Sequence, residues 1–220
     1  MKTKFPILAL DHDDTTVNST PEINYPAFLD TLAHLRPGVT YTYDEFIGLC
    51  CHPGFDDLCR KILKFDEKEM DFEVRNWRRF GAATIPSAVP GLKALIERQR
   101  AAGGIVAVVS HSMRDTIERD WNAHFGTQPD AIYDWDDDPA KRKPAPFPLL
   151  DLSRRYGVPV SGILMIDDLR PGVEMTRAAG ARVGAAGWAC QSEEVREYMR
   201  ASCDYYFGST AELEAFLFDE

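Results

Sequence analysis

Phe5-Pro6-Ile7-Leu8-Ala9-Leu10 leads directly into Asp11-His12-Asp13-Asp14-Thr15 near the start of the chain. The apolar run predicts a buried strand, and that strand would deliver Asp11 and Asp13 to the carboxyl edge of a sheet. Open α/β sheets bind their ligands at this edge. Carboxylates crowded there repel one another unless a cation lies between them, and carboxylate oxygens suit Mg²⁺. The stretch therefore predicts a metal site or a pair of carboxylates that share a proton.

Further apolar runs alternate with helical patterns after residue 87. Strands are expected at 105–109, 131–133, 163–166 and 181–185. Helices are expected at 87–102, 113–125 and 171–180, with a last helix opened by the capping box Ser209-Thr210-Ala211-Glu212. Strands that alternate with helices predict an α/β fold with a Rossmann-like parallel sheet and helices on both faces.

Residues 19–87 interrupt this rhythm and contain no clear strand. Helices are expected at 26–35, after Thr42, at 55–63 and at 66–80. We expect an all-α cap domain at 19–87, inserted into a core domain formed by 1–18 and 88–220. An insertion directly after the first strand would overhang the carboxyl edge of the sheet, where a lid belongs.

Composition limits the possible partners and compartment. The chain has 220 residues and a formal net charge of −10, which argues against nucleic acid and anionic membranes as partners. No apolar run approaches the length of a membrane span. The number of cysteines is odd, and their spacing matches neither a disulfide framework nor a zinc site, which favours a reduced, cytoplasmic chain. The five cysteines are Cys50, Cys51, Cys59, Cys190 and Cys203. Nothing in the sequence requires more than a monomer.

Four features lie at the expected strand ends or in the loops beside them. These are Asp11-x-Asp13-x-Thr15, Ser110, Lys143 before Pro144, and Asp167-Asp168. Their order and residue types resemble the haloacid dehalogenase (HAD) superfamily, and the resemblance covers essentially the whole chain. The inserted helices resemble the α-helical cap of the phosphoglycolate-phosphatase-like branch.

The resemblance implies a magnesium-dependent phosphatase that hydrolyses a small phosphorylated metabolite through an aspartyl-phosphate. Asp11 would be the nucleophile, and Asp13 would be the acid and base, in surroundings that favour its neutral form. Ser110 would donate a hydrogen bond to the phosphoryl group, and Lys143 would neutralise its charge. The implied Mg²⁺ ligands are Asp11, the backbone carbonyl of Asp13, Asp168 and Asp167.

Three further residues are candidate substrate contacts in addition to Ser110 and Lys143. Thr15 belongs to the first motif, His111 follows Ser110, and His52 stands in the loop of the expected cap. Each has a purely structural alternative, since Thr commonly occupies turns and a loop His is often solvated. The family usually has Gly where this chain has Asp14, although Asp is among the residues that tolerate unusual backbone conformations.

Several other functions remain as alternatives. Dehalogenases of the family lack the second Asp, so Asp13 favours phosphate ester chemistry. Phosphomutases carry a cap His near the position of Ile23 in this chain, which makes a mutase or other phosphotransferase the less favoured enzyme. A signalling receiver has its acidic pair and its phosphorylated Asp in a different order along the chain. The last alternative is a member of the family that binds phosphate but does not catalyse. The only argument against it is that the chain retains Asp11, Asp13, Lys143 and Asp168.

Overall fold

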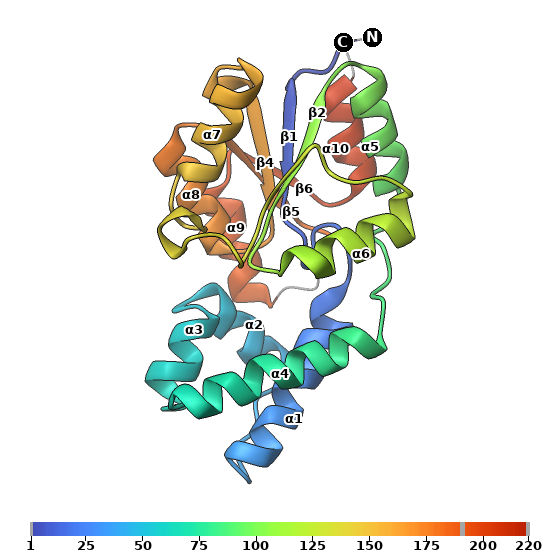
Figure 1. Cartoon of the computed structure of the whole chain (residues 1–220). Helices are drawn as coiled ribbons and strands as arrows, with labels where there is room; N and C mark the ends of the chain where they lie inside the picture. The colour runs from blue at the N-terminus through green and yellow to red at the C-terminus, as the bar shows by residue number, and fades with distance from the viewer. Residues whose placement is uncertain (1, 190–191, 219–220) are drawn as a thin grey trace.

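A computed structural model describes residues 2–189 and 192–218, so that Cys190 lies outside the described residues. Its centre is a parallel sheet with the strand order β3-β2-β1-β4-β5-β6 (Figure 1). The strands are β1 (Ile7–Leu10), β2 (Ile105–Val109), β3 (Ala131–Tyr133), β4 (Ile163–Asp167), β5 (Arg182–Ala186) and β6 (Tyr205–Phe207). β1 pairs with both β2 and β4, so its carboxyl end lies in the middle of the edge. The predicted parallel α/β sheet is confirmed.

Helices cover both faces of this sheet. They are α5 (Leu92–Ala101), α6 (Arg114–Phe125), α7 (Phe147–Tyr156), α8 (Arg170–Ala179), α9 (Glu193–Ser202) and α10 (Thr210–Phe218). Leu8 and Leu10 pack in the same cluster as residues of α5, α6 and α10. Ile7 and Ala9 pack on the opposite face, with residues of α7 and α8. Because β1 is buried on both faces, its sequence is continuously apolar rather than alternating.

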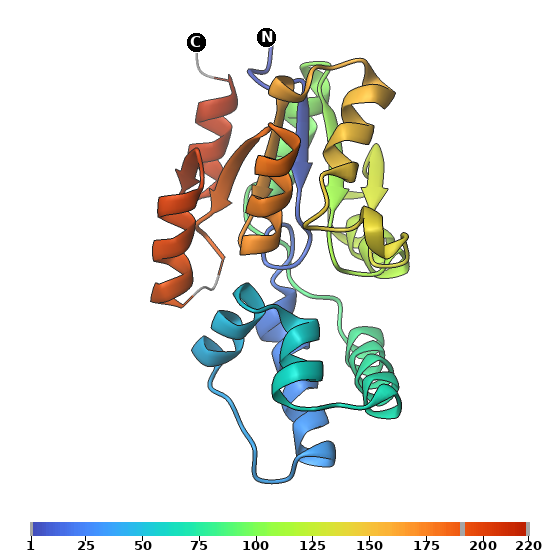
Figure 2. The same cartoon turned by 90° about the vertical axis from the view of Figure 1, so that its left-hand side faces the viewer.

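The helices between β1 and α5 form one segment, residues 20–83, that we call the helical segment; the short turns η3 (Pro139–Lys141) and η4 (Val160–Gly162) lie outside it. It contains η1 (Thr20–Asn24), α1 (Tyr25–Leu35), α2 (Tyr43–Cys51), α3 (Phe55–Asp57), η2 (Leu58–Ile62) and α4 (Glu67–Ala83). Figure 2 shows it at one end of the sheet, away from the two termini. It has an apolar cluster around Phe28, Phe46 and Leu58 that continues onto Val195 and Met199 of α9.

The chain enters and leaves the helical segment through two stretches that lie side by side, near residues 17 and 88. Val17 forms an antiparallel bridge with Ala88. The backbone N–H of Asn18 donates to Ser87 at 2.8 Å, and the N–H of Val89 donates to Thr16 at 3.0 Å. This double crossing ties both ends of the helical segment to the loop that follows β1.

Local signals explain most helix starts, and the exceptions have physical reasons. Thr42 with Glu45 and Asp66 with Glu69 form capping boxes at α2 and α4. The helix expected at 87–102 begins only at Leu92, because Gly91 has a left-handed φ of 82° and the residues before it pair with the chain near Val17. The sequence reading missed α7, α9 and the three-residue strand β6.

Within the described ranges, no helix combines the length and apolar character needed to cross a membrane.

Candidate active site

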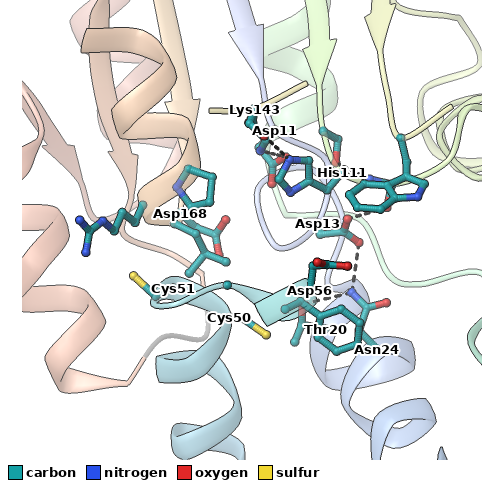
Figure 3. Close-up of a pocket in the computed structure, with 18 of the residues that line it drawn as sticks. Asp11, Asp13, Thr20, Asn24, Cys50, Cys51, Asp56, His111, Lys143 and Asp168 are labelled. Carbon is teal, nitrogen blue, oxygen red and sulfur yellow. Dashed lines mark hydrogen bonds and ion pairs between the residues drawn. The ribbon is translucent and has the colours of Figure 1, made fainter. Parts of the chain in front are cut away.

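A cavity of about 660 Å³ lies between the carboxyl end of the sheet and the helical segment. Asp11, Lys143 and Asp168 reach it from strand ends and loops of the core, and Cys50 and Asp56 face them from the helical segment (Figure 3). The first motif follows β1, Ser110 follows β2, and Asp167 ends β4. Because β2, β1 and β4 are parallel neighbours, their carboxyl ends bring these distant residues together.

Lys143 occupies the centre of the buried end of the cavity. Its Nζ lies 2.7 Å from Asp11 Oδ1 and 2.9 Å from Asp167 Oδ2. Burial alone would lower the pKa of the Lys143 ammonium, but the two carboxylates outweigh burial and raise it. Lys143 is therefore a fixed positive charge between two acids.

Three buried carboxylates surround this single cation. Asp11, Asp167 and Asp168 each offer an oxygen, and these atoms lie within 4.8 Å of one another. Burial is the main cause that raises the pKa of Asp11 to about 7 and the pKa of Asp168 well above its usual value, and neighbouring acids add to it. An all-oxygen cluster with excess negative charge fits Mg²⁺. These residues could therefore hold the metal that the family uses.

Asp13 has different surroundings from Asp11. Its carboxylate accepts hydrogen bonds from Ser112 Oγ at 2.5 Å, from Asn24 Nδ2 at 3.3 Å and from the Ser19 hydroxyl. Burial would raise the pKa of Asp13, but the electrostatic effect of His12 and these hydrogen bonds together lower it. The expectation that its surroundings favour the neutral form is thus wrong for this arrangement, because the donors stabilise the charged form.

Buried side chains fix the loop that carries both acids. His12 is fully buried, with Nδ1 2.9 Å from the Thr16 hydroxyl and Nε2 3.2 Å from Asp120 Oδ2. Asp14 adopts a left-handed φ of 58°, the conformation that Gly usually provides, and its carboxylate accepts from the Thr20 N–H at 3.0 Å. The departure from the family pattern at Asp14 therefore keeps the turn and adds a buried acid whose pKa burial raises to about 7.

The other predicted contact residues divide into two groups. Ser110, His111 and His52 all line the cavity. His111 Nε2 donates to the Lys143 carbonyl at 2.9 Å, and burial is the first cause that lowers the pKa of His111 to about 4. Thr15 is fully buried and lies outside the cavity lining, so the structure does not bring it to the site.

The sequence reading missed most of the lining on the side of the helical segment. Met70, Glu73, Val74 and Trp77 of α4 all line the cavity. The spacing of Met70, Val74 and Trp77 indicates this inward face, and Glu73 is the carboxylate on it. Trp77 Nε1 donates to Asn24 Oδ1 at 2.7 Å, and Asn24 in turn donates to Asp13. A hydrogen-bonded chain thus connects α4 to the second acid of the motif.

Cysteines of the α2 end also border the cavity. Cys51 is buried, Cys50 is half-buried, and both line the cavity. Burial raises the pKa of both thiols. They are therefore neutral packing residues rather than nucleophiles.

The sequence model of the family described as haloacid dehalogenase-like hydrolase matches residues 8–186. The chain belongs to this family. Protein CbbY of Rhodobacter capsulatus is 32% identical over 182 residues, which are 77% of this chain and 80% of that protein. The expected family is thereby confirmed.

Solved structures share the fold over nearly the whole chain. A predicted phosphoglycolate phosphatase from Haemophilus somnus 129PT has a TM-score of 0.76 at 20% identity, covering 96% of this chain and 97% of that chain. CbbY from Rhodobacter sphaeroides, described in complex with xylulose-(1,5)bisphosphate, has a TM-score of 0.75 at 22% identity, covering 95% of this chain and 96% of that chain.

Proposed function

We propose that this HAD-like hydrolase is a magnesium-dependent phosphatase that hydrolyses a small phosphorylated metabolite through an aspartyl-phosphate at Asp11. The observation that carries the proposal is the buried contact of Lys143 with Asp11 and Asp167, beside Asp168. One ammonium among three carboxylates leaves the cluster short of positive charge. A divalent cation and a phosphoryl group together complete such a site.

Asp11 is the proposed nucleophile. Its carboxylate oxygen attacks phosphorus, the bond from phosphorus to the alcohol oxygen breaks, and an aspartyl-phosphate forms. Lys143 holds one oxygen of Asp11 and reduces the repulsion between the carboxylate and the incoming phosphate. Ser110 lies at the end of β2, where its hydroxyl can donate to a phosphoryl oxygen. Asp11, Asp168, Asp167 and the Asp13 carbonyl would hold Mg²⁺, which would supply further charge neutralisation.

Asp13 is the proposed acid and base. It protonates the leaving alcohol oxygen in the first step and takes a proton from the attacking water in the second. In the observed arrangement, Ser112, Ser19 and Asn24 stabilise its charged form. We therefore infer that the carboxyl group turns away from these donors before it acts as an acid.

The helical segment is the proposed cap, with its limits at residues 19 and 87. The antiparallel bridge between Val17 and Ala88 supports these limits, because the two crossings of the chain lie side by side there. A cap at the carboxyl edge excludes water from the phosphoryl group and contacts the alcohol part of the substrate. His111 from the core and His52 from the cap are the proposed contacts for it. Ile23, which is buried, cannot serve the proton transfers of a mutase.

Phosphate release tests the proposal directly. The purified chain is incubated with Mg²⁺ and p-nitrophenyl phosphate, and then with a panel of phosphorylated metabolites. We expect metal-dependent phosphate release that chelation abolishes and added Mg²⁺ restores. Failure to hydrolyse any phosphate ester in the presence of Mg²⁺ would favour a non-catalytic phosphate-binding protein, and formation of an isomeric sugar phosphate would favour a mutase.

A further inference from the structure

Glu73 of α4 is a buried acid whose charge nothing in the described chain neutralises. Its exposed fraction is 6%, and it lines the cavity. No described residue gives its carboxylate a hydrogen bond or an ion pair. Burial alone raises the pKa of Glu73 to about 7. A buried carboxyl of this kind is costly to the fold unless a bound group completes it.

The other acids that line the cavity on the helical segment and on α8 already have cations. Asp56 pairs with Arg60 at 2.9 Å, and Asp57 pairs with Lys61 at 2.8 Å. Glu174 pairs with Arg170 at 2.7 Å. Among the described residues that line the cavity away from Lys143, Glu73 is therefore the acid left for a ligand.

The cations that line the cavity are also paired with carboxylates. Lys143 is held by two carboxylates at the phosphate end. Arg170 donates to Glu174 and also to His52 Nδ1 at 3.2 Å. Of the described residues that line the cavity away from Lys143, four are acids and one is a cation, namely Asp56, Asp57, Glu73, Glu174 and Arg170. A second phosphate or a carboxylate on the substrate would meet net negative charge in this half of the cavity.

The walls around Glu73 are apolar and aromatic. Met70, Val74 and Trp77 share its helix face, and Phe46 and Phe55 line the cavity from α2 and α3. Apolar walls strengthen an electrostatic contact by excluding water, and aromatic faces attract an organic cation. An ammonium group satisfies both the acid and the rings, whereas a neutral polyol would leave the acid without a counter-charge.

We propose that the half of the cavity formed by the helical segment binds the alcohol portion of a phosphomonoester that carries one phosphate and an amino group, with Glu73 pairing with the ammonium. The proposal rests on the phosphatase function given above and specifies its substrate class. It contrasts with the bisphosphate described for the Rhodobacter sphaeroides CbbY complex.

A matched series of synthetic esters tests this preference. The three substrates are benzyl phosphates that carry an aminomethyl, a hydroxymethyl or a carboxyl group at position 4 of the ring, so that size and reacting bond are alike. We expect the chain to favour the aminomethyl ester over the hydroxymethyl ester by ~10- to 100-fold in kcat/KM, which is the range of a hydrogen bond to a charged partner. The carboxyl ester should be the poorest substrate.

Two variants locate the source of the preference. Glu73→Gln keeps the shape and removes the charge, so the ratio between the aminomethyl and hydroxymethyl esters should fall to within about threefold. Glu67→Gln is the control on the same helix, because Glu67 is exposed, pairs with Arg60 and lies outside the lining. It should keep the ratio of the unmodified chain.

The outcomes separate this inference from the proposed function. If the unmodified chain hydrolyses p-nitrophenyl phosphate with Mg²⁺ but treats the three benzyl esters alike, prefers the hydroxymethyl or carboxyl ester, or hydrolyses none of them, the inference is wrong while the phosphatase function stands. If it hydrolyses no phosphate ester, the function itself fails. A preference for the amine that persists in Glu73→Gln would also overturn the role of Glu73.

Discussion

Buried carboxylates are paired differently at the two ends of the cavity. At the sheet edge, Asp11, Asp167 and Asp168 crowd around Lys143, and the charges come from three parallel strands and the loops that follow them. On the helical segment, Asp56 and Asp57 each pair with a cation four residues further along the chain, whereas Glu73 is buried and has no ion pair among the described residues. The first end is the proposed site of the phosphoryl group and the cation, which would be common to all substrates. The second end is the proposed site that would distinguish one alcohol from another.

The comparison indicates where each substitution should act. Changes at the sheet edge should affect turnover of every substrate, whereas changes on α4 should affect the choice among substrates. The hydrogen bonds from Trp77 to Asn24 and from Asn24 to Asp13 connect the two ends. Through these hydrogen bonds, the helical segment contacts Asp13, the proposed acid and base, directly.

Among the substitutions at the sheet edge, Asp11→Asn should cause the largest loss of activity. The amide cannot form the phosphoryl ester, so phosphate release should fall by ~1000-fold or more for all substrates. Folding should survive, because Asn has the shape of Asp and Lys143 keeps its ion pair with Asp167. Steady-state assays and thermal unfolding check both points. Asp115→Asn, at an exposed site on α6, is the control.

Lys143→Met should have the next largest effect. It removes the cation between Asp11 and Asp167, and we expect a loss of ~100- to 1000-fold in kcat/KM. The metal-free protein should lose about 3–5 kcal/mol in the free energy of unfolding near neutral pH, because the substitution leaves two buried carboxylates unpaired. Chemical denaturation measures this change. Unchanged stability would contradict the buried ion pairs, and Lys141→Met at the exposed neighbouring position provides the reference.

Metal binding should stabilise the protein more at high than at low pH. The folded-state pKa values of Asp11 and Asp168 are raised, so the metal-free fold binds more protons than the unfolded chain. Its stability therefore falls as the pH rises from about 4 through about 7. Mg²⁺ replaces those protons, so the increase in Tm on adding Mg²⁺ should grow over this range. An increase that is the same at about pH 5 and about pH 8 would argue against these carboxylates as the site.

Asp14→Gly should have the smallest effect. Gly relieves the left-handed backbone, which costs roughly 1 kcal/mol for other residues, but loses the hydrogen bond from the Thr20 N–H. The two changes offset one another, so stability should stay within about 1 kcal/mol and activity within about threefold. Asp14→Ala keeps the strain and loses the bond, so it should be the less stable of the two in denaturant titrations. A large loss of activity in Asp14→Gly would mean that the third acid takes part in the site.

The sequence predicted the parts of the fold that have a strong local signal. β1 to β5 were recognisable because strands buried on both faces are continuously apolar. β6 is only three residues long, and α9 carries many charges, so neither gave a clear pattern. The Asp11, Lys143 and Asp168 cluster followed from the order of motifs, since parallel neighbours bring distant strand ends together.

Contacts between distant segments could not be predicted in the same way. Ser112 is 99 residues from Asp13 in the chain, and its hydrogen bond helps to lower the pKa of Asp13 rather than raise it. Glu73 lies on α4, which packs against α1 and η1 and lines the cavity, and its burial depends on this tertiary packing, which the helical pattern alone does not show. Both features depend on how segments distant in the sequence pack together.

The most direct test of the central claim is a structure of the protein with Mg²⁺ and beryllofluoride, which mimics a phosphoryl group bound to a carboxylate. We predict a beryllium adduct on the Asp11 carboxylate, with Lys143 beside it and Mg²⁺ bound to Asp11 and Asp168. An adduct on another residue, or Mg²⁺ bound at the site with Asp11 unmodified, would contradict the assignment of Asp11 as the nucleophile.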